Sequence, residues 1–122
     1  MTDIKKEASA GQRVYRPLVY ICSPYKGDVE GNTKTAREFC RYALDNGQIP
    51  LAPHLMFPQF MSDSDKDERE LALFMDIVLM GKCDEVWVLA ERISSGMQLE
   101  IDKATKRRQT VRYFNARFEE VV

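Results

Sequence analysis

The stretch DEVWVLAERISSGMQLEIDKA, residues 84–104, decides the fold of this chain. It opens with an unbroken apolar run at 86–90, VWVLA. Such a short run is typical of a strand buried on both faces of a parallel sheet. After a brief loop, Ser94, Ser95 and Gly96 offer hydroxyl N-caps and a flexible backbone where a helix should begin. The stretch therefore predicts a strand, a loop and a helix in succession.

The predicted helix carries one acidic residue of special interest, Glu100. Met97, Ile101 and Ala104 share one helical face at i, i+4, i+7 spacing, and Glu100 lies one turn into the helix, just past the strand. Open α/β sheets bind ligands at that edge. Two interpretations stay open. Glu100 is either a helix residue stabilised by the helix dipole, by roughly 0.3–1 kcal/mol, or a catalytic nucleophile or general base.

Three more segments have the character of short strands. They lie at residues 18–22, 49–52 and 110–114. Pro50 has no N–H to donate to a sheet, so it places the second of these strands at an edge or limits its length.

Helical patterns separate the strands. The first helix is predicted to begin at about Asn32, a good N-cap, and to end at Gly47. Residues 53–60 contain two prolines and are predicted to form an apolar loop. The next helix runs over about 67–81, and it is expected to turn these residues inward: Leu71, Phe74, Ile77 and Val78.

The alternation of strands and helices decides the architecture. It implies a parallel sheet with helices on both faces and right-handed crossovers, which is a small doubly wound α/β fold. The length of 122 residues suits one domain. We expect residues 17–122 to form that domain and residues 1–16 to form a loose tail.

Composition excludes several classes of function. Hydrophobic residues make up 44% of the chain, charged residues 30%, and the net charge is −1, so no global field steers it toward nucleic acid or an anionic membrane. No apolar run approaches the roughly 20 residues of a membrane span, and no secretory signal is recognisable. The three cysteines lack metal-type spacing and are expected to be reduced, in keeping with a cytoplasmic protein.

The carboxyl edge of the predicted sheet collects three segments, at 23–28, 53–60 and 91–100. The first βα loop of such folds often supplies groups to a phosphate or sugar, which makes Ser23 and the nearby Tyr25 and Lys26 candidates. Tyr20 would need to point into the cleft to take part. Neither GxGxxG nor GxxxxGK[ST] is present, so a conventional dinucleotide or P-loop site is not indicated.

Three further titratable residues each have two interpretations. Asp76 lies in an apolar helical run, so it is either buried, where it is paired or faces a cleft, or it simply points to solvent. His54, the single histidine, is either an acid, base or ligand donor, or a packed side chain. Asp84 is better explained as a turn residue that caps the preceding helix than as a site residue.

A basic run lies near the C-terminus. It fits a solvated helix face with favourable charge at the helix end better than a nucleic acid surface, because it lacks interleaved aromatic residues. Its members are Lys103, Lys106, Arg107, Arg108 and Arg112.

Several motifs, in order, resemble a known family. Residues 94–104, SSGMQLEIDKA, resemble the D-x-G-x-x-x-E-[IL]-G-Y-A segment of nucleoside 2-deoxyribosyltransferases. Residues 20–25, YICSPY, resemble their first strand and loop, and Asp76, eight residues before Asp84, resembles an acidic residue at the same spacing. YICSPY, PLAPHLMFPQF and SSGMQLEI are also similar to a phage and bacterial branch of uncharacterised small proteins in that superfamily. The resemblance covers about residues 17–114.

The resemblance implies a flavodoxin- or Rossmann-like three-layer sandwich with a mostly parallel sheet of four to five strands. It implies that Glu100 attacks the anomeric carbon of a nucleoside or nucleotide and that Asp76 handles the leaving base. Tyr20 and Ser23 would line the sugar site, and Lys26 could hold a 5′-phosphate. The other residues expected to bind substrate are Tyr25, His54, Ser94, Ser95 and Gly96.

The resemblance also implies a homodimer or larger homo-oligomer and chemistry without a metal or organic cofactor. Two positions depart from the family pattern. Ser94 replaces the Asp six residues before the nucleophile, and Asp102 replaces a Gly. Ser94 favours an alternative function, a nucleotide-binding or sequestering module that has lost turnover, whereas the retained Glu100 favours the enzyme.

Overall fold

The computed structural model describes residues 13–121. These residues form a sheet in the order β2-β1-β3-β4-β5, in which all neighbours are parallel except β4 and β5. The strands are β1 (Leu18–Cys22), β2 (Ile49–Leu51), β3 (Glu85–Leu89), β4 (Thr110–Phe114) and β5 (Glu120–Val121). The predicted α/β sandwich with a mostly parallel sheet is therefore confirmed.

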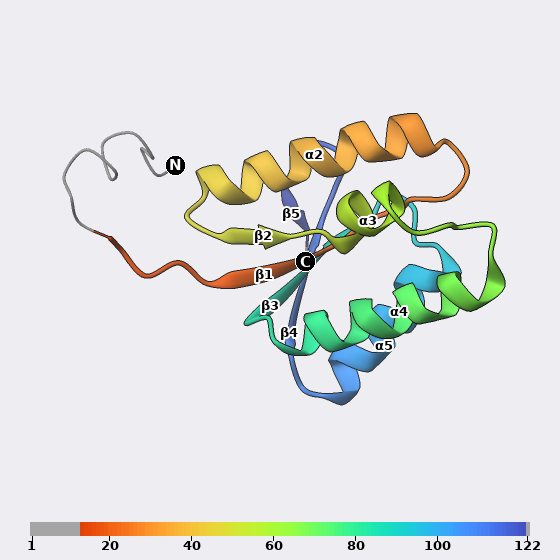
Figure 1. Cartoon of the computed structure of the whole chain (residues 1–122). Coiled ribbons are helices and arrows are strands. Elements are labelled where there is room, and N and C mark those ends of the chain that lie inside the picture. The colour runs from red at the N-terminus through yellow and green to blue at the C-terminus, as the bar shows by residue number, and fades with distance from the viewer. Residues whose placement is uncertain (1–12, 122) are drawn as a thin grey trace.

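Helices cover both faces of the sheet. Figure 1 shows α2 on one side of the strands and α4 with α5 on the other. The short α3 and the 3₁₀ turn η1 follow β2. The helical bounds are α2 (Val29–Asp45), α3 (Pro53–Met56), η1 (Phe57–Gln59), α4 (Lys66–Gly81) and α5 (Ser95–Lys106).

Strand β1 sends alternate side chains to the two faces, as a strand must. Val19 and Ile21 join the core beneath α2, with Phe39 among their neighbours. Tyr20 and Cys22 join the core beneath α4 and α5. This alternation carries a phenol and a thiol to the side of the sheet where α5 lies.

The predicted inward face of α5 is confirmed, because Met97, Ile101 and Ala104 are all buried. Ser94 is its N-cap, since its hydroxyl accepts a hydrogen bond from the Met97 N–H at 3.2 Å. The N-cap predicted from the sequence therefore sets the start of the helix that carries Glu100.

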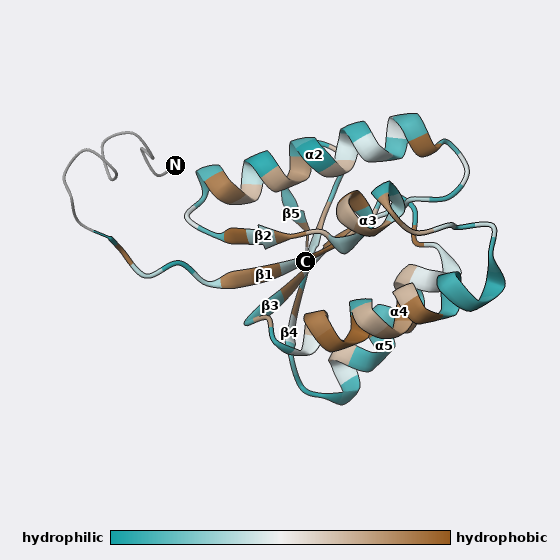
Figure 2. Cartoon of the chain, in the orientation of Figure 1, coloured by the Kyte–Doolittle hydropathy of each residue, from teal (hydrophilic) through white to brown (hydrophobic). Residues whose placement is uncertain are grey.

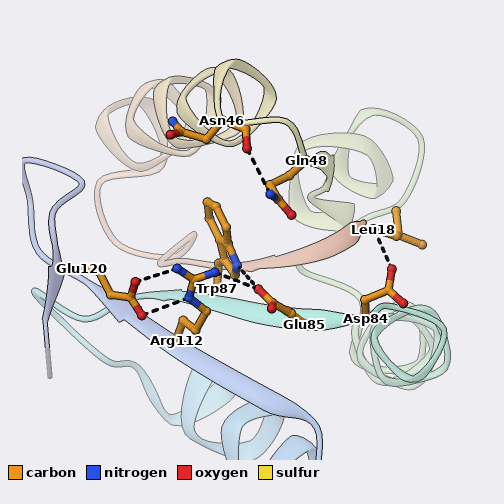
Figure 3. A network of polar contacts seen from close by, with 8 residues as sticks. All are labelled: Leu18, Asn46, Gln48, Asp84, Glu85, Trp87, Arg112 and Glu120. Atoms are coloured by element: carbon orange, nitrogen blue, oxygen red, sulfur yellow. Dashed lines mark hydrogen bonds and ion pairs between the residues drawn. The ribbon is translucent and has the colours of Figure 1, made fainter. Parts of the chain in front are cut away.

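The sheet ends in a polar network that joins three strands (Figure 3). Arg112 contacts both carboxylate oxygens of Glu120, at 2.6 and 3.0 Å, and reaches Glu85 at 3.2 Å. The Trp87 indole N–H donates to the same Glu85 oxygen at 2.8 Å. Paired charges thus hold the short antiparallel strand β5, which the sequence pattern did not predict.

Two predicted boundaries need correction. Helix α2 begins before Asn32, because Asp28 is its N-cap and accepts a hydrogen bond from the Gly31 N–H. The Asn32 side chain instead binds the carbonyls of Tyr25 and Lys26, both at 3.0 Å. The segment 53–60 is not a plain loop, because each of its prolines lies in the first turn of a short helix, where a missing N–H costs nothing.

The predicted inward face of α4 is largely wrong. Ile77 does pack against the core, but Leu71, Phe74 and Val78 are 50%, 65% and 42% exposed. The run LALFMDIVLM is apolar around most of the helix, so its spacing alone admits more than one inward stripe.

Asp84 also differs from its prediction as a helix cap. Its Oδ2 accepts a hydrogen bond from the Leu18 N–H at 2.8 Å (Figure 3). The same oxygen accepts a second hydrogen bond from the Tyr15 hydroxyl at 3.2 Å. It therefore ties β3 to the start of β1. The tail predicted for residues 1–16 falls mostly outside the described residues. Between residues 13 and 121, no helix is long and apolar enough to cross a membrane.

Candidate active site

Glu100 is buried at the carboxyl end of β1, with only 8% of its surface exposed. The Tyr20 hydroxyl donates a hydrogen bond to its Oε2, and the Cys22 thiol lies 3.5 Å from its Oε1. Both donors come from one strand, two residues apart, so they reach the carboxylate from the same side of the sheet. Burial raises the pKa of Glu100, and the two hydrogen bonds oppose that rise.

Asp76 approaches the same carboxylate from α4. Burial and the negative charge of Glu100 raise the pKa of Asp76 to about 7. Its Oδ1 is buried and has no hydrogen-bond partner among residues 13–121. Of the two interpretations left open by the sequence, a carboxyl group turned to solvent does not describe this geometry, because Asp76 Oδ1 is buried. A carboxyl group that keeps its proton near neutral pH is placed here beside a second acid.

Tyr20 stays protonated in this setting. Burial, and then the charges of Glu100 and Asp76, raise the pKa of Tyr20 well above its usual range. The phenol therefore acts as a neutral donor to Glu100 and does not compete with the two acids for charge. The residue is 1% exposed, and its hydroxyl points to Glu100.

Ser23 and His54 form a second pair at this edge, with Ser23 Oγ 2.8 Å from His54 Nε2. The histidine comes from α3 and is mostly buried, and that burial lowers the pKa of His54 to about 4. A neutral imidazole has one donor and one acceptor nitrogen, so it can either give a hydrogen bond to the Ser23 hydroxyl or accept one from it.

The remaining predicted residues form no hydrogen bond with Glu100. The Asn32 amide fixes the loop carbonyls of Tyr25 and Lys26, and the Lys26 side chain is exposed. Ser94 uses its hydroxyl as the cap of α5. Two neighbours in the first turn of that helix are exposed: Ser95 and Gly96.

A cavity of about 280 Å³ opens on the α2 side of the same edge. Ser23 is the predicted site residue that lines it. The other lining residues are Pro24, Asn32, Thr35, Leu89, Glu91, Arg92 and Ala116. Neither Arg92 nor Glu91 is predicted as a site residue from the sequence. Both residues belong to the segment 91–100, which follows strand β3 and was predicted to lie at the carboxyl edge of the sheet.

Sequence reasoning also missed the role of Cys22. Its position two residues after Tyr20 on a buried strand was the signal that both side chains share a face. Burial and the Glu100 charge raise the pKa of the Cys22 thiol well above its usual value, so it is a donor and not a thiolate. Across the described part of the chain, no three His, Cys, Asp or Glu side chains gather as a metal site.

The fold and this site define a small Rossmann-like α/β protein with a buried acidic pair at the carboxyl edge of its sheet. Residues 17–114 match the family model described as a domain of unknown function, DUF7768, and the chain belongs to that family. No curated protein matches the chain.

Solved structures match the fold. One of them is a 2-deoxyribosyltransferase from the psychrotolerant bacterium Bacillus psychrosaccharolyticus, described as a biocatalyst for the synthesis of antiviral and antitumoral nucleosides. It superposes with a TM-score of 0.61 at 14% identity, over 86% of this chain and 76% of that chain. The resemblance drawn from the sequence is therefore confirmed at the level of the fold.

Proposed function

We propose that this protein breaks or transfers the N-glycosidic bond of a nucleoside or a nucleoside 5′-monophosphate, with Glu100 as the nucleophile. The observation that carries the proposal is the meeting of Glu100 and Asp76. Two carboxyl groups share a buried position, and one of the Asp76 oxygens has no partner in the described chain. Burying acids in this way is costly, and a bound substrate would supply the missing partner.

The first chemical step follows from the different protonation states of the two acids. A Glu100 oxygen attacks the anomeric carbon as the bond to the base breaks, and the electron pair of that bond leaves with the base. Asp76, with a pKa of about 7, can donate the proton that the departing base needs. The Glu100 carboxylate also stabilises the positive charge that develops on the sugar.

The second step returns the site to its starting state. Water or a second base attacks the anomeric carbon of the glycosyl-Glu100 ester, and the carboxylate leaves. Asp76 accepts the proton released by that attacking group. Tyr20 holds Oε2 throughout, so Oε1, which has only the weaker thiol donor, is the oxygen that we expect to attack. These steps use no metal or organic cofactor.

Substrate recognition is assigned to the groups that surround this edge. The Ser23–His54 pair is expected to contact the sugar, and Tyr25 and the first turn of α5, with Ser94, Ser95 and Gly96, to bound the substrate. Lys26 is exposed on the first loop, where it can reach a 5′-phosphate. Lys26→Ala should then weaken nucleoside monophosphates about tenfold and spare nucleosides. Equal losses for both would remove Lys26 from the site.

The decisive experiment measures the release of free base by chromatography. The protein is incubated with ribo- and deoxyribonucleosides and their 5′-monophosphates, beside the Glu100→Gln variant. Base release by the natural protein alone would establish the chemistry and name the substrate. Equal release by both proteins would refute Glu100 as the nucleophile.

A nucleotide-binding module without turnover is the second candidate. The observation that favours it is Ser94, which caps α5 and gives no third carboxylate to the site. This function predicts no base release from any compound but a raised melting temperature with one of them. A ligand at a hundredfold excess over its Kd stabilises the folded state by about 2.7 kcal/mol, which a thermal shift detects readily.

A further inference from the structure

The cavity of about 280 Å³ lies on the α2 side of the sheet, whereas the acidic pair lies on the α4 and α5 side. Leu89, one of the walls of the cavity, belongs to the core beneath α2. Tyr20 and Cys22, which hold Glu100, belong to the core on the other face. In the proposed reaction the departing base meets Asp76, on α4, so that reaction does not account for this cavity.

The turn between β4 and β5 forms one wall of the cavity, and contacts within the chain hold it in place. Ala116 of this turn lines the cavity. Asn115 Oδ1 accepts hydrogen bonds from two backbone N–H groups of the turn, at 2.9 and 3.0 Å. Phe118 has a φ of 61°, which a bulky residue rarely adopts, and its ring stacks on Phe39 with the centroids 5.1 Å apart. This wall is therefore formed before any ligand arrives.

The size and the apolar walls of the cavity suit one flat heterocycle. Pro24, Leu89 and Ala116 supply the apolar surface, against which the faces of a ring can pack. Figure 2 shows that α2 is mostly hydrophilic, whereas strand β1, which leads to Pro24, is mostly hydrophobic. Pockets for whole ligands begin at about 300 Å³, so this cavity has room for a base but little more.

Helix α2 offers hydrogen-bond acceptors to the cavity. The Asn32 amide N–H groups donate to two loop carbonyls, both at 3.0 Å, and its Oδ1 has no donor among residues 13–121. The Thr35 hydroxyl donates to the Gly31 carbonyl at 3.0 Å and keeps its lone pairs for another donor. A ligand that carries N–H or O–H groups would fit this side of the cavity.

The loop after β3 adds two charged side chains of opposite sign. Glu91 and Arg92 both line the cavity, and neither forms an ion pair with another described residue. A carboxylate only accepts hydrogen bonds and can accept two at once, whereas a guanidinium presents a rigid fork of donors. The two residues are adjacent in the sequence, so they read neighbouring edges of one ligand.

We propose that this cavity binds a guanine base. One edge of guanine carries two donors, N1–H and the 2-amino group, and the next edge carries two acceptors, O6 and N7. Glu91 accepts from the first edge, and Arg92 donates to the second, which is the commonest specific contact between a charged side chain and a base. Asn32 Oδ1 and Thr35 Oγ1 remain for other donors, such as the hydroxyl groups of an attached sugar.

Other small ligands leave one of the two charges without a partner. Adenine has no N–H at N1 and no oxygen at position 6, so it satisfies neither the carboxylate nor the guanidinium fully. A free phosphate would be repelled by Glu91, and a simple cation would be repelled by Arg92. Guanine is the common base that uses both side chains in full.

The first test is isothermal titration calorimetry of the full chain with guanosine, inosine and adenosine. Inosine lacks the 2-amino group, and adenosine lacks N1–H and O6 as well. We expect guanosine to bind at least about tenfold more tightly than either of the others, because each loss leaves a polar group of the cavity unpaired. No binding of guanosine, or equal binding of all three, would overturn the proposal.

The Glu100→Gln variant separates this site from the acidic pair. It should bind guanosine as tightly as the natural chain, because Glu100 lies on the other face of the sheet. A loss of binding would place guanosine at the acidic pair and would refute the cavity site. These titrations do not depend on turnover, so they remain decisive even if the protein releases no base from any nucleoside.

Arg92→Ala tests the contact with O6 and N7. Guanosine should bind at least about tenfold more weakly to this variant, because a bidentate contact is lost. The natural chain should also bind 7-deazaguanosine, which lacks N7, more weakly than guanosine, and the variant should bind the two alike. Lys34→Ala is the matched control, since Lys34 is an exposed cation on α2 that does not line the cavity. Unchanged affinity in Arg92→Ala would contradict the proposal.

Glu91→Ala tests the contact with the 2-amino group. The preference for guanosine over inosine should fall from at least about tenfold to about twofold or less, because the group that distinguishes them no longer meets a carboxylate. Glu30→Ala is the control, since Glu30 is exposed on α2 outside the cavity, and it should keep the full preference. A full preference in Glu91→Ala as well would remove the carboxylate from the site.

Guanosine 5′-monophosphate identifies the source of the base. Similar affinities for guanosine and its monophosphate would support recognition of the base alone, as the size of the cavity predicts. Binding of the monophosphate without any binding of guanosine would show that a phosphate is recognised instead, and that result would overturn the proposal.

Discussion

Two polar clusters of this molecule differ in whether their charges are paired with opposite charges. At the β4–β5 end of the sheet, Arg112 pairs with Glu120 and Glu85, and Glu85 also accepts from Trp87. At the carboxyl edge, Glu100 and Asp76 are two acids whose pKa values are both raised, and no described cation pairs with either.

This difference supports a structural role for the Arg112 cluster and the functional role that we propose for the acidic pair. The Arg112 cluster satisfies its charges within the chain, so it can hold strands together without any ligand. The acidic pair is satisfied only in part, by the donors Tyr20 and Cys22, and it leaves Asp76 Oδ1 without a partner in the described chain. An arrangement that costs stability and perturbs pKa values at a ligand edge is typical of an active site.

The largest expected effect comes from removing the acid at the centre of the pair. Glu100→Gln should lower base release at least about a thousandfold, because an amide is not a nucleophile. It should not lower the melting temperature, since it removes a buried charge that burial disfavours. Chromatography of released base and a thermal melt check the two halves. A large loss of stability together with activity would mean that Glu100 supports the fold.

Asp76→Asn removes the carboxyl group that we expect to donate a proton to the departing base. Base release should slow by about a hundredfold, most strongly for bases that leave poorly without protonation. In the natural protein the rate of base release should fall as pH rises through about 7, where Asp76 loses its proton. The variant should not show this fall. The rate of base release is measured against pH for both proteins. If the rate of the variant falls in the same way, a group other than Asp76 causes the fall.

The same substitution changes how stability depends on pH. The folded pKa of Asp76 is about 7, above its unfolded value, so the folded state binds the extra proton. Its contribution is complete below about pH 4 and is lost as pH rises toward and through 7. Asp76→Asn should therefore stabilise the protein at pH 8, by about 1–2 kcal/mol after allowance for its partial contact with solvent. Urea unfolding at pH 5 and pH 8 measures this, and equal effects at the two pH values would contradict the raised pKa.

Arg112→Ala tests the structural role of the cluster in which Arg112 pairs with Glu85 and Glu120. The loss leaves Glu85 and Glu120 without their shared cation, and we expect the free energy of unfolding to fall by about 1 kcal/mol, because the group is partly exposed. Base release should stay within a factor of two, since the cluster does not touch the acidic pair. Urea unfolding and the base-release assay separate the two effects. A selective loss of activity would mean that the clusters are coupled.

The sequence predicted more of the fold than of the site. Strand β3 and helix α5 follow from one apolar run and one serine cap, which are local signals. The exposure of Leu71, Phe74 and Val78 on α4 did not follow, because the run is apolar around most of the helix and only tertiary packing chooses a face. The strand β5 rests on the long-range contact of Arg112 with Glu120, which no local pattern records.

The candidate site also has features that the sequence could predict and features that depend on tertiary packing. The positions of Glu100 and Asp76 could be named from spacing and resemblance, because each lies at a fixed offset from the central strand. The hydrogen bond from Cys22 could not, since it depends on how close α5 lies to β1. The pairing of Ser23 with His54 likewise depends on α3. This helical turn was predicted as a loop because its segment contains two prolines.

The smallest expected effect concerns that thiol. Cys22→Ala removes the donor to Glu100 Oε1, so the pKa of Glu100 should rise further and a smaller fraction of it should be ionised at acidic pH. We expect base release, measured at an acidic and at an alkaline pH, to fall about two- to threefold at the acidic pH and to recover at the alkaline pH. The effect is small because an S–H group is a weak donor, and this one also lies 3.9 Å from the Met97 carbonyl. Cys22→Ser should retain most of the activity at both pH values. A loss in the alanine variant that does not depend on pH would show that the thiol fills space beside Glu100 and does not tune it, and the contrast between the two clusters would then rest on Tyr20 and Asp76 alone.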